Sequence, residues 1–149
     1  MLVPKALSRR LTAVALVAVV AVALTGCGSD PLNAASVKGK VLLDGKPLTK
    51  GSVRFVPDKA KGNTAGVEPT GVIGDTGEYE LITNGKSGAP LGSYTVCVVS
   101  GEIPDSGNPT AVPKGGPAPR FAQPETSKLS VDVVASPAAG AYDLKVSAK

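Results

Sequence analysis

Apolar and polar residues alternate along much of the chain after residue 36, with the period of two that is typical of half-buried β-strands. The alternation predicts seven strands, at 37–43, 52–56, 71–74, 78–83, 93–99, 129–133 and 142–146. No segment in this part repeats apolar residues at helical spacing. The segment 93–99 is apolar almost throughout, which predicts a central strand covered on both faces.

Turn-forming residues separate these segments. Asp44-Gly45 and Asp75-Thr76-Gly77 predict hairpin turns, and Pro137 to Gly140 predicts a third turn. Short strands at this spacing predict an all-β fold, a β-sandwich of two antiparallel sheets. A parallel sheet needs crossover helices, and the sequence predicts none. The stretches 59–70 and 101–123 are expected to be surface loops, the second one rich in proline.

The first residues have the pattern of a secretory signal. Lys5, Arg9 and Arg10 precede an apolar run from Leu11 to Leu24, which is 14 residues long. A helix needs about 20 apolar residues to cross a bilayer core of roughly 30 Å, so a permanent membrane span is the weaker alternative.

The apolar run ends at Leu24-Thr25-Gly26-Cys27. This tetrapeptide resembles the bacterial lipobox, in which a large apolar residue and two small residues precede the cysteine that is lipidated. We therefore expect a lipoprotein signal peptide at 1–26, cleavage before Cys27, and a membrane attachment through acyl chains on that cysteine. Ordinary signal cleavage, which leaves Cys27 as a free thiol, is the alternative. Gly28 is not the Asp that marks inner-membrane retention in some bacteria, which favours the outer membrane.

After the lipidated cysteine, residues 27–36 are rich in Gly, Ser, Asp, Pro and Asn, and predict a flexible tether before a domain at 37–149. The remaining thiol, Cys97, lies in the apolar segment 93–99. Buried packing is the favoured interpretation, and an intermolecular disulfide is the alternative.

Composition excludes several classes of function. The 149 residues suit one domain, and the absence of His excludes Ser-His and Cys-His nucleophile pairs and imidazole metal sites. The net charge of +4 owes much to the signal segment, since 13 basic and 12 acidic residues follow residue 26. A nearly neutral body with few aromatic residues does not suit nucleic-acid binding. We expect no cofactor and no metal.

Three groups of residues are candidates for chemical sites. Asp75-Thr76-Gly77 matches the Asp-Thr-Gly of aspartic proteases, but Asp-x-Gly is also ordinary turn chemistry, which is favoured. Asp75, Glu78 and Glu80 offer carboxylates to Ca²⁺, but alternation places the two glutamates on a solvated strand face. Tyr79, Tyr94 and Tyr142 would suit a sugar-binding platform, but they lie on the apolar sides of their strands, which favours core packing.

Several motifs together resemble a known family. The segment from Val37 to Val56 is similar to the opening hairpin of carboxypeptidase regulatory-like domains, also called transthyretin-like or prealbumin-like. Residues 74–81 resemble the D-x-x-G-x-Y/F-x-L hairpin of that family, and 89–96 its P-x-G-x-Y-x-V strand entry. The segments 119–131 and 142–146 look like small secreted lipoproteins of planctomycete bacteria.

The resemblance implies a seven-stranded, Greek-key-like sandwich that serves as a folding, docking or ligand-contact module, and it implies no reaction. We expect a monomeric, non-enzymatic lipoprotein of the cell envelope, anchored in the membrane and contacting an envelope protein. A polysaccharide- or peptide-binding surface protein is the competing interpretation.

Overall fold

The structure is a computed structural model that describes residues 33–101 and 116–149. Its regular elements are mostly β-strands, which confirms the all-β class. The strands are β1 (Ala34–Ala35), β2 (Lys38–Leu43), β3 (Lys46–Pro47), β4 (Gly51–Pro57), β5 (Thr70–Ile73), β6 (Glu78–Glu80), β7 (Ile82–Thr83), β8 (Lys86–Ser87), β9 (Ala89–Pro90), β10 (Gly92–Ser100), β11 (Ser130–Val133) and β12 (Leu144–Val146). Two 3₁₀ turns, η1 (Lys59–Lys61) and η2 (Pro119–Ala122), and one short helix, α1 (Pro124–Ser127), complete them.

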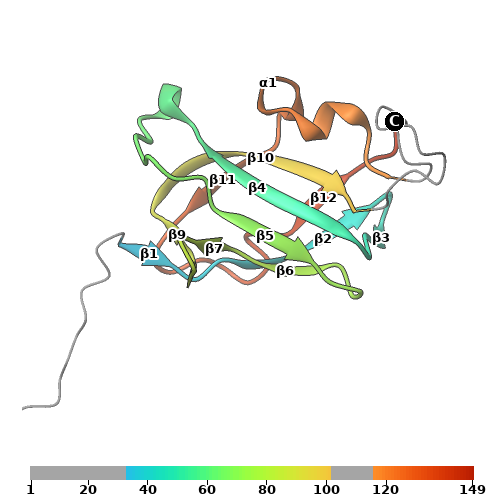
Figure 1. The fold of residues 1–149 in the computed structure, drawn as a ribbon, viewed down its shortest axis with the longest axis horizontal. Helices are drawn as coiled ribbons and strands as arrows, with labels where there is room; N and C mark the ends of the chain where they lie inside the picture. The colour runs from blue at the N-terminus through green and yellow to red at the C-terminus, as the bar shows by residue number, and fades with distance from the viewer. Residues whose placement is uncertain (1–32, 102–115) are drawn as a thin grey trace, which may run out of the picture.

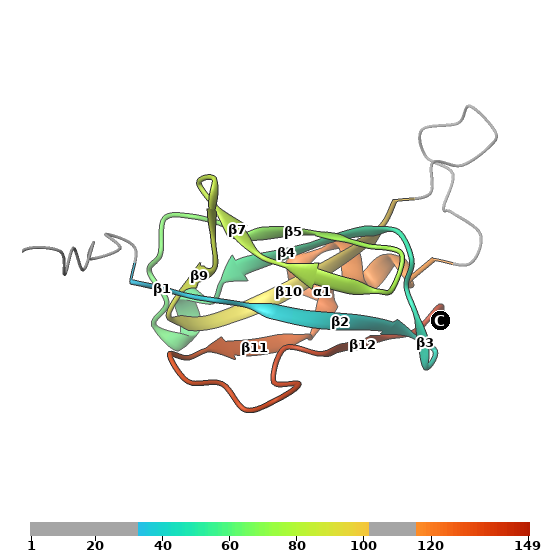
Figure 2. The same cartoon turned by 90° about the horizontal axis from the view of Figure 1, so that it is seen from below.

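Ten of the strands form one curled sheet, and β1 and β9 form a separate two-stranded sheet. The order of the large sheet is β11-β10-β4-β5-β6-β2-β12, with β3 added to β2 and the β7–β8 hairpin added to β5. Although β11 and β12 stand at the two ends of this order, they run along the same side of the molecule (Figure 2). The curling brings the inward-facing side chains of all these strands around one core.

One pairing differs from the expectation of antiparallel sheets. Strand β12 is parallel to β2, in the register Leu144↔Val41 to Val146↔Leu43. Crossover helices are needed only when consecutive strands are parallel neighbours. Here β2 and β12 are far apart in the chain, and β12 is reached by a loop from β11, which stands at the opposite end of the strand order.

The predicted alternation is confirmed in the burial of side chains. In β2 and the residue before it, Val37 and Val41 are buried, while Lys38 is exposed. In β12, Leu144 and Val146 are buried and Lys145 is exposed. The Asp44-Gly45 turn is confirmed too, because Asp44 (φ 48°) and Gly45 (φ 84°) both adopt the left-handed conformation that such hairpins require.

Three aromatic rings form the centre of the core. The ring of Phe55 on β4 lies 5.8 Å from that of Tyr94 and 6.4 Å from that of Tyr79, both in tilted arrangements. The two tyrosine hydroxyls are also satisfied inside the protein. Tyr94 donates to the carbonyl of Pro90 at 2.8 Å, and Tyr79 donates to the carbonyl of Tyr142 at 2.6 Å.

The hydrogen bond from Tyr79 to Tyr142 lies where the backbone of β2 closely approaches the segment that leads into β12. A Cβ atom placed on Gly39 of β2 would lie 2.2 Å from the carbonyl oxygen of Tyr142 and 3.0 Å from the hydroxyl of Tyr79. The segment that leads into β12 can therefore lie against β2 only because residue 39 has no side chain.

Two predicted boundaries differ in the structure. The segment predicted as one strand at 78–83 is interrupted at Leu81. The resulting strands β6 and β7 both pair with β5, but the second neighbour of β6 is β2 and that of β7 is β8. Residues 34–35, predicted as part of the tether, form β1 and pair with β9.

The end of the predicted proline-rich loop is also more than a surface loop. Within 116–123, η2 forms and buries Phe121 and Ala118 in the core, and α1 follows it. Proline at the first turns of η2 and α1 suits the start of such elements. The sequence pattern did not predict the four-residue helix at 124–127, which is not one of the crossover helices that a parallel sheet needs. The rest of that loop, 102–115, lies outside the described residues.

The contact at Gly39 generates a stability prediction. We expect Gly39→Ala to lower the free energy of unfolding by more than about 2 kcal/mol, because the added methyl group overlaps backbone atoms that cannot move aside cheaply. Gly66→Ala is the matched control, since a Cβ there meets nothing within 4 Å. Urea unfolding of the two variants checks this, and equal stability of both would contradict the assigned contact.

Candidate functional site

The predicted lipidation site lies outside the described residues. This applies to Leu24, Thr25 and Gly26 of the cleavage motif and to Cys27 itself. Within 33–101 and 116–149, none of the helices has the length and apolar character required to cross a bilayer.

Cys97 is buried, as predicted. It lies in β10 with 1% of its surface exposed, and its thiol is free. Register places it beside Arg54 of β4, and η2 and α1 pack against β10. Burial raises the pKa of the Cys97 thiol, and a hydrogen bond with Arg54 opposes this rise. A thiol in this environment is a packing residue of low reactivity.

The Asp75-Thr76-Gly77 segment forms the turn between β5 and β6. The amide of Gly77 donates to the carbonyl of Gly74 at 2.9 Å, and Gly77 has a φ of 80°. Asp75 is exposed at this turn. The structure thus confirms the turn interpretation of this segment.

The two glutamates of β6 lie on the outer face of the sheet and pair with lysines of β2. Glu78 lies 3.5 Å from Lys40, and Glu80 lies 3.3 Å from Lys38. A hydrogen bond from Ser87, together with Lys38, lowers the pKa of Glu80. In the part of the chain that the structure describes, no three Cys, Asp or Glu side chains come together as metal ligands.

The tyrosines do not form an exposed platform. Tyr79, Tyr94 and Tyr142 are exposed by 4%, 0% and 3%, and Phe121 by 5%. Burial raises the pKa of Tyr79, and the negative charge of Asp143 adds to the rise. The prediction of core packing is confirmed for all three tyrosines.

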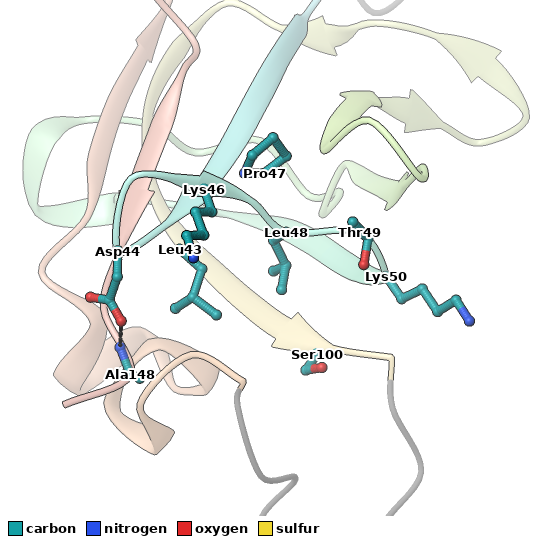
Figure 3. Close-up of a pocket in the computed structure, with 9 residues that line it drawn as sticks. All are labelled: Leu43, Asp44, Lys46, Pro47, Leu48, Thr49, Lys50, Ser100 and Ala148. Atoms are coloured by element: carbon teal, nitrogen blue, oxygen red, sulfur yellow. Dashed lines mark hydrogen bonds between the residues drawn. The ribbon is translucent and has the colours of Figure 1, made fainter.

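A groove at one end of the molecule is a candidate ligand site. It encloses about 530 Å³, which lies within the range of small-ligand sites. Figure 3 shows its walls, which come from the β2–β3 hairpin, the connection to β4, the end of β10 and the C-terminal segment. Its lining residues are Leu43, Asp44, Lys46, Pro47, Leu48, Thr49, Lys50, Ser100 and Ala148.

The groove has an apolar floor and a polar rim. Leu43 and Leu48 extend their side chains into it, while Lys50 points outward at its edge (Figure 3). Asp44 is the carboxylate of the lining, and it accepts a hydrogen bond from the amide of Ala148 at 3.2 Å. Neither Lys46 nor Lys50 forms an ion pair with any carboxylate in the described ranges. Sequence analysis did not identify this groove.

Comparison of the chain with protein-family models, with curated proteins and with solved structures found no match.

The burial of Cys97 predicts slow chemical modification. In the purified folded protein we expect Cys97 to react with iodoacetamide at pH 8 at least about tenfold more slowly than after unfolding in urea, because few thiolates form and access is blocked. Mass spectrometry of the peptide that contains Cys97 measures this. Equal rates in the folded and unfolded protein would contradict the assigned burial.

The raised pKa of Tyr79 predicts a change of stability with pH. The unfolded tyrosine ionises near its ordinary value of 10.0, whereas the folded one stays protonated, so its stabilising contribution is complete below pH 10 and declines above it. Below pH 10, Tyr79→Phe should lower the free energy of unfolding by about 1 kcal/mol through the lost hydrogen bond. Urea unfolding at pH 8 and pH 11 should show this difference shrink, and a difference that does not depend on pH would contradict the assignment.

Proposed function

We propose that the chain is a lipid-anchored lipoprotein of the bacterial cell envelope whose β-domain acts as a non-catalytic interaction module. The Leu24-Thr25-Gly26-Cys27 motif at the end of the signal-like segment carries the proposal of an anchor. Two or three acyl chains on Cys27 would give lasting attachment, since each buried CH₂ contributes about 0.8 kcal/mol. We propose the outer membrane as its location, as the residue after the cysteine favours.

The arrangement of the domain supports this proposal. Strand β1, which is the first described element after the proposed anchor, lies at one end of the long axis, and the β2–β3 hairpin lies at the other end (Figures 1 and 2). The groove, which includes that hairpin, is therefore far from the point where the chain enters the domain. The proposed anchor and the groove therefore belong to opposite ends of the domain.

For the fold we propose a seven-stranded, transthyretin-like sandwich with Greek-key connections. The seven strands on the main path of the sheet, β11-β10-β4-β5 and β6-β2-β12, supply the two layers. Support comes from strands that are neighbours in space but not in sequence, such as β2 with β12 and β4 with β10. The short strands β1, β3, β7, β8 and β9 are additions at loops and edges of these layers.

The groove also favours the competing role, a binding protein for an envelope ligand. Its volume and its mixture of leucine side chains with charged rim groups suit recognition. Because the tyrosines and Phe121 are buried, a sugar ligand held by ring stacking is not favoured.

Metabolic labelling tests the anchor. Cells that express the protein and are fed an alkyne analogue of palmitate should label it, and Cys27→Ala should abolish the label and release the protein from the membrane fraction. Cys97→Ala is the matched control and should label as strongly as the unmodified chain, since its thiol is buried. Equal labelling of the Cys27→Ala variant would refute the anchor.

A further inference from the structure

We propose that the groove at the β2–β3 end binds an extended acidic segment of a partner protein, with Lys46 and Lys50 pairing with its carboxylates. This deepens the proposed interaction role. It rests on that function only for the location of the partner, because binding itself requires no lipid.

The charge of the rim is the first argument. Lys46 and Lys50 stand at the groove without an ion-pair partner among the described residues, whereas Lys38 and Lys40 on the sheet face each pair with a glutamate. Asp44 is the carboxylate of the lining, and the amide of Ala148 already holds it in place. The lining and rim of the groove therefore carry two lysines and one carboxylate, which favours an anionic ligand.

The floor indicates which kind of anion fits. Leu43 is half-buried and Leu48 is buried, and both line the groove beneath the lysines. A small inorganic anion would leave this apolar surface exposed to water. An extended peptide, in contrast, directs alternate side chains to opposite sides, so apolar residues can lie on the leucines while carboxylates reach the rim.

An acidic polysaccharide is the less suitable occupant. Proteins commonly hold sugar rings by stacking them on exposed aromatic rings, and no aromatic side chain lines this groove. The aromatic residues Phe55, Tyr79, Tyr94, Phe121 and Tyr142 are all buried. The groove also lies at the opposite end of the domain from β1, where the chain from the proposed anchor enters (Figure 1).

The test is an NMR titration of the ¹⁵N-labelled protein, purified from membranes in detergent, or from the soluble fraction if it is found there. The probe is a blocked hexapeptide that alternates glutamate and leucine, and its glutamine counterpart serves as the uncharged control. We expect chemical-shift changes at the amides of residues 43–50, Ser100 and Ala148, with clearly weaker binding of the glutamine peptide. Raising the salt concentration should weaken binding of the acidic peptide, because the lysines are exposed.

The double variant Lys46→Gln/Lys50→Gln should raise the Kd for the acidic peptide about five- to tenfold. Lys59→Gln/Lys145→Gln removes two exposed lysines outside the groove and is the matched control, which should leave the Kd unchanged. Both double variants should keep the amide spectrum of a folded protein, since these side chains are exposed.

Three outcomes would overturn the proposal. The first is the absence of shift changes at the groove up to millimolar peptide, and the second is equal binding of the glutamate and glutamine peptides. The third is binding of an oligogalacturonate, but not of the peptide, with the same dependence on Lys46 and Lys50, which would assign the groove to an acidic polysaccharide. Because the assay contains purified protein alone, its failure leaves the labelling test of Cys27 unaffected.

Discussion

The fold depends on a close backbone contact between β2 and the segment that enters β12. The hydroxyl of Tyr79 on β6 donates to the carbonyl of Tyr142, and Gly39 leaves room for that carbonyl against β2. A buried carbonyl without a partner costs about 1–3 kcal/mol, so the tyrosine and the glycine act together. They hold β12 in its parallel register with β2, and through it the C-terminal residues that form one wall of the groove.

The faces of the strands were predictable from the sequence, whereas their partners were not. Alternation identifies the buried side of a strand because successive side chains point in opposite directions, and this worked for Val37 and Val41 as it did for Leu144 and Val146. Pairing depends instead on contacts between distant segments. The parallel pair of β2 and β12 joins residues about a hundred positions apart, and no local pattern encodes that choice.

Loops with little apolar content hid two further features. Phe121 lies in a segment of prolines and polar residues. Neither the two-residue period of strands nor the 3.6-residue period of helices therefore identifies it, and yet η2 places it in the core. The groove was missed for a related reason. Its walls come from residues 43–50, from Ser100 and from Ala148, and only the folded chain brings these together. The signal that the sequence did contain is the spacing of Lys46 and Lys50 around an apolar leucine in a hairpin without nearby glutamates.

The two pairs of lysines differ in whether the fold neutralises their charge or leaves it available to a ligand. Lys38 and Lys40 lie on the middle of a strand, opposite Glu80 and Glu78 in the register of β2 and β6, where cross-strand pairing neutralises them. Lys46 on β3 instead lies opposite Leu43 of β2, and Lys50 lies in the connection from β3 to β4. A charge that the fold does not neutralise can pair with a ligand without first breaking an internal ion pair, and the leucines beneath it add apolar surface to bury. For this reason we propose the end of the sheet, rather than its charged face, as the surface that binds a partner.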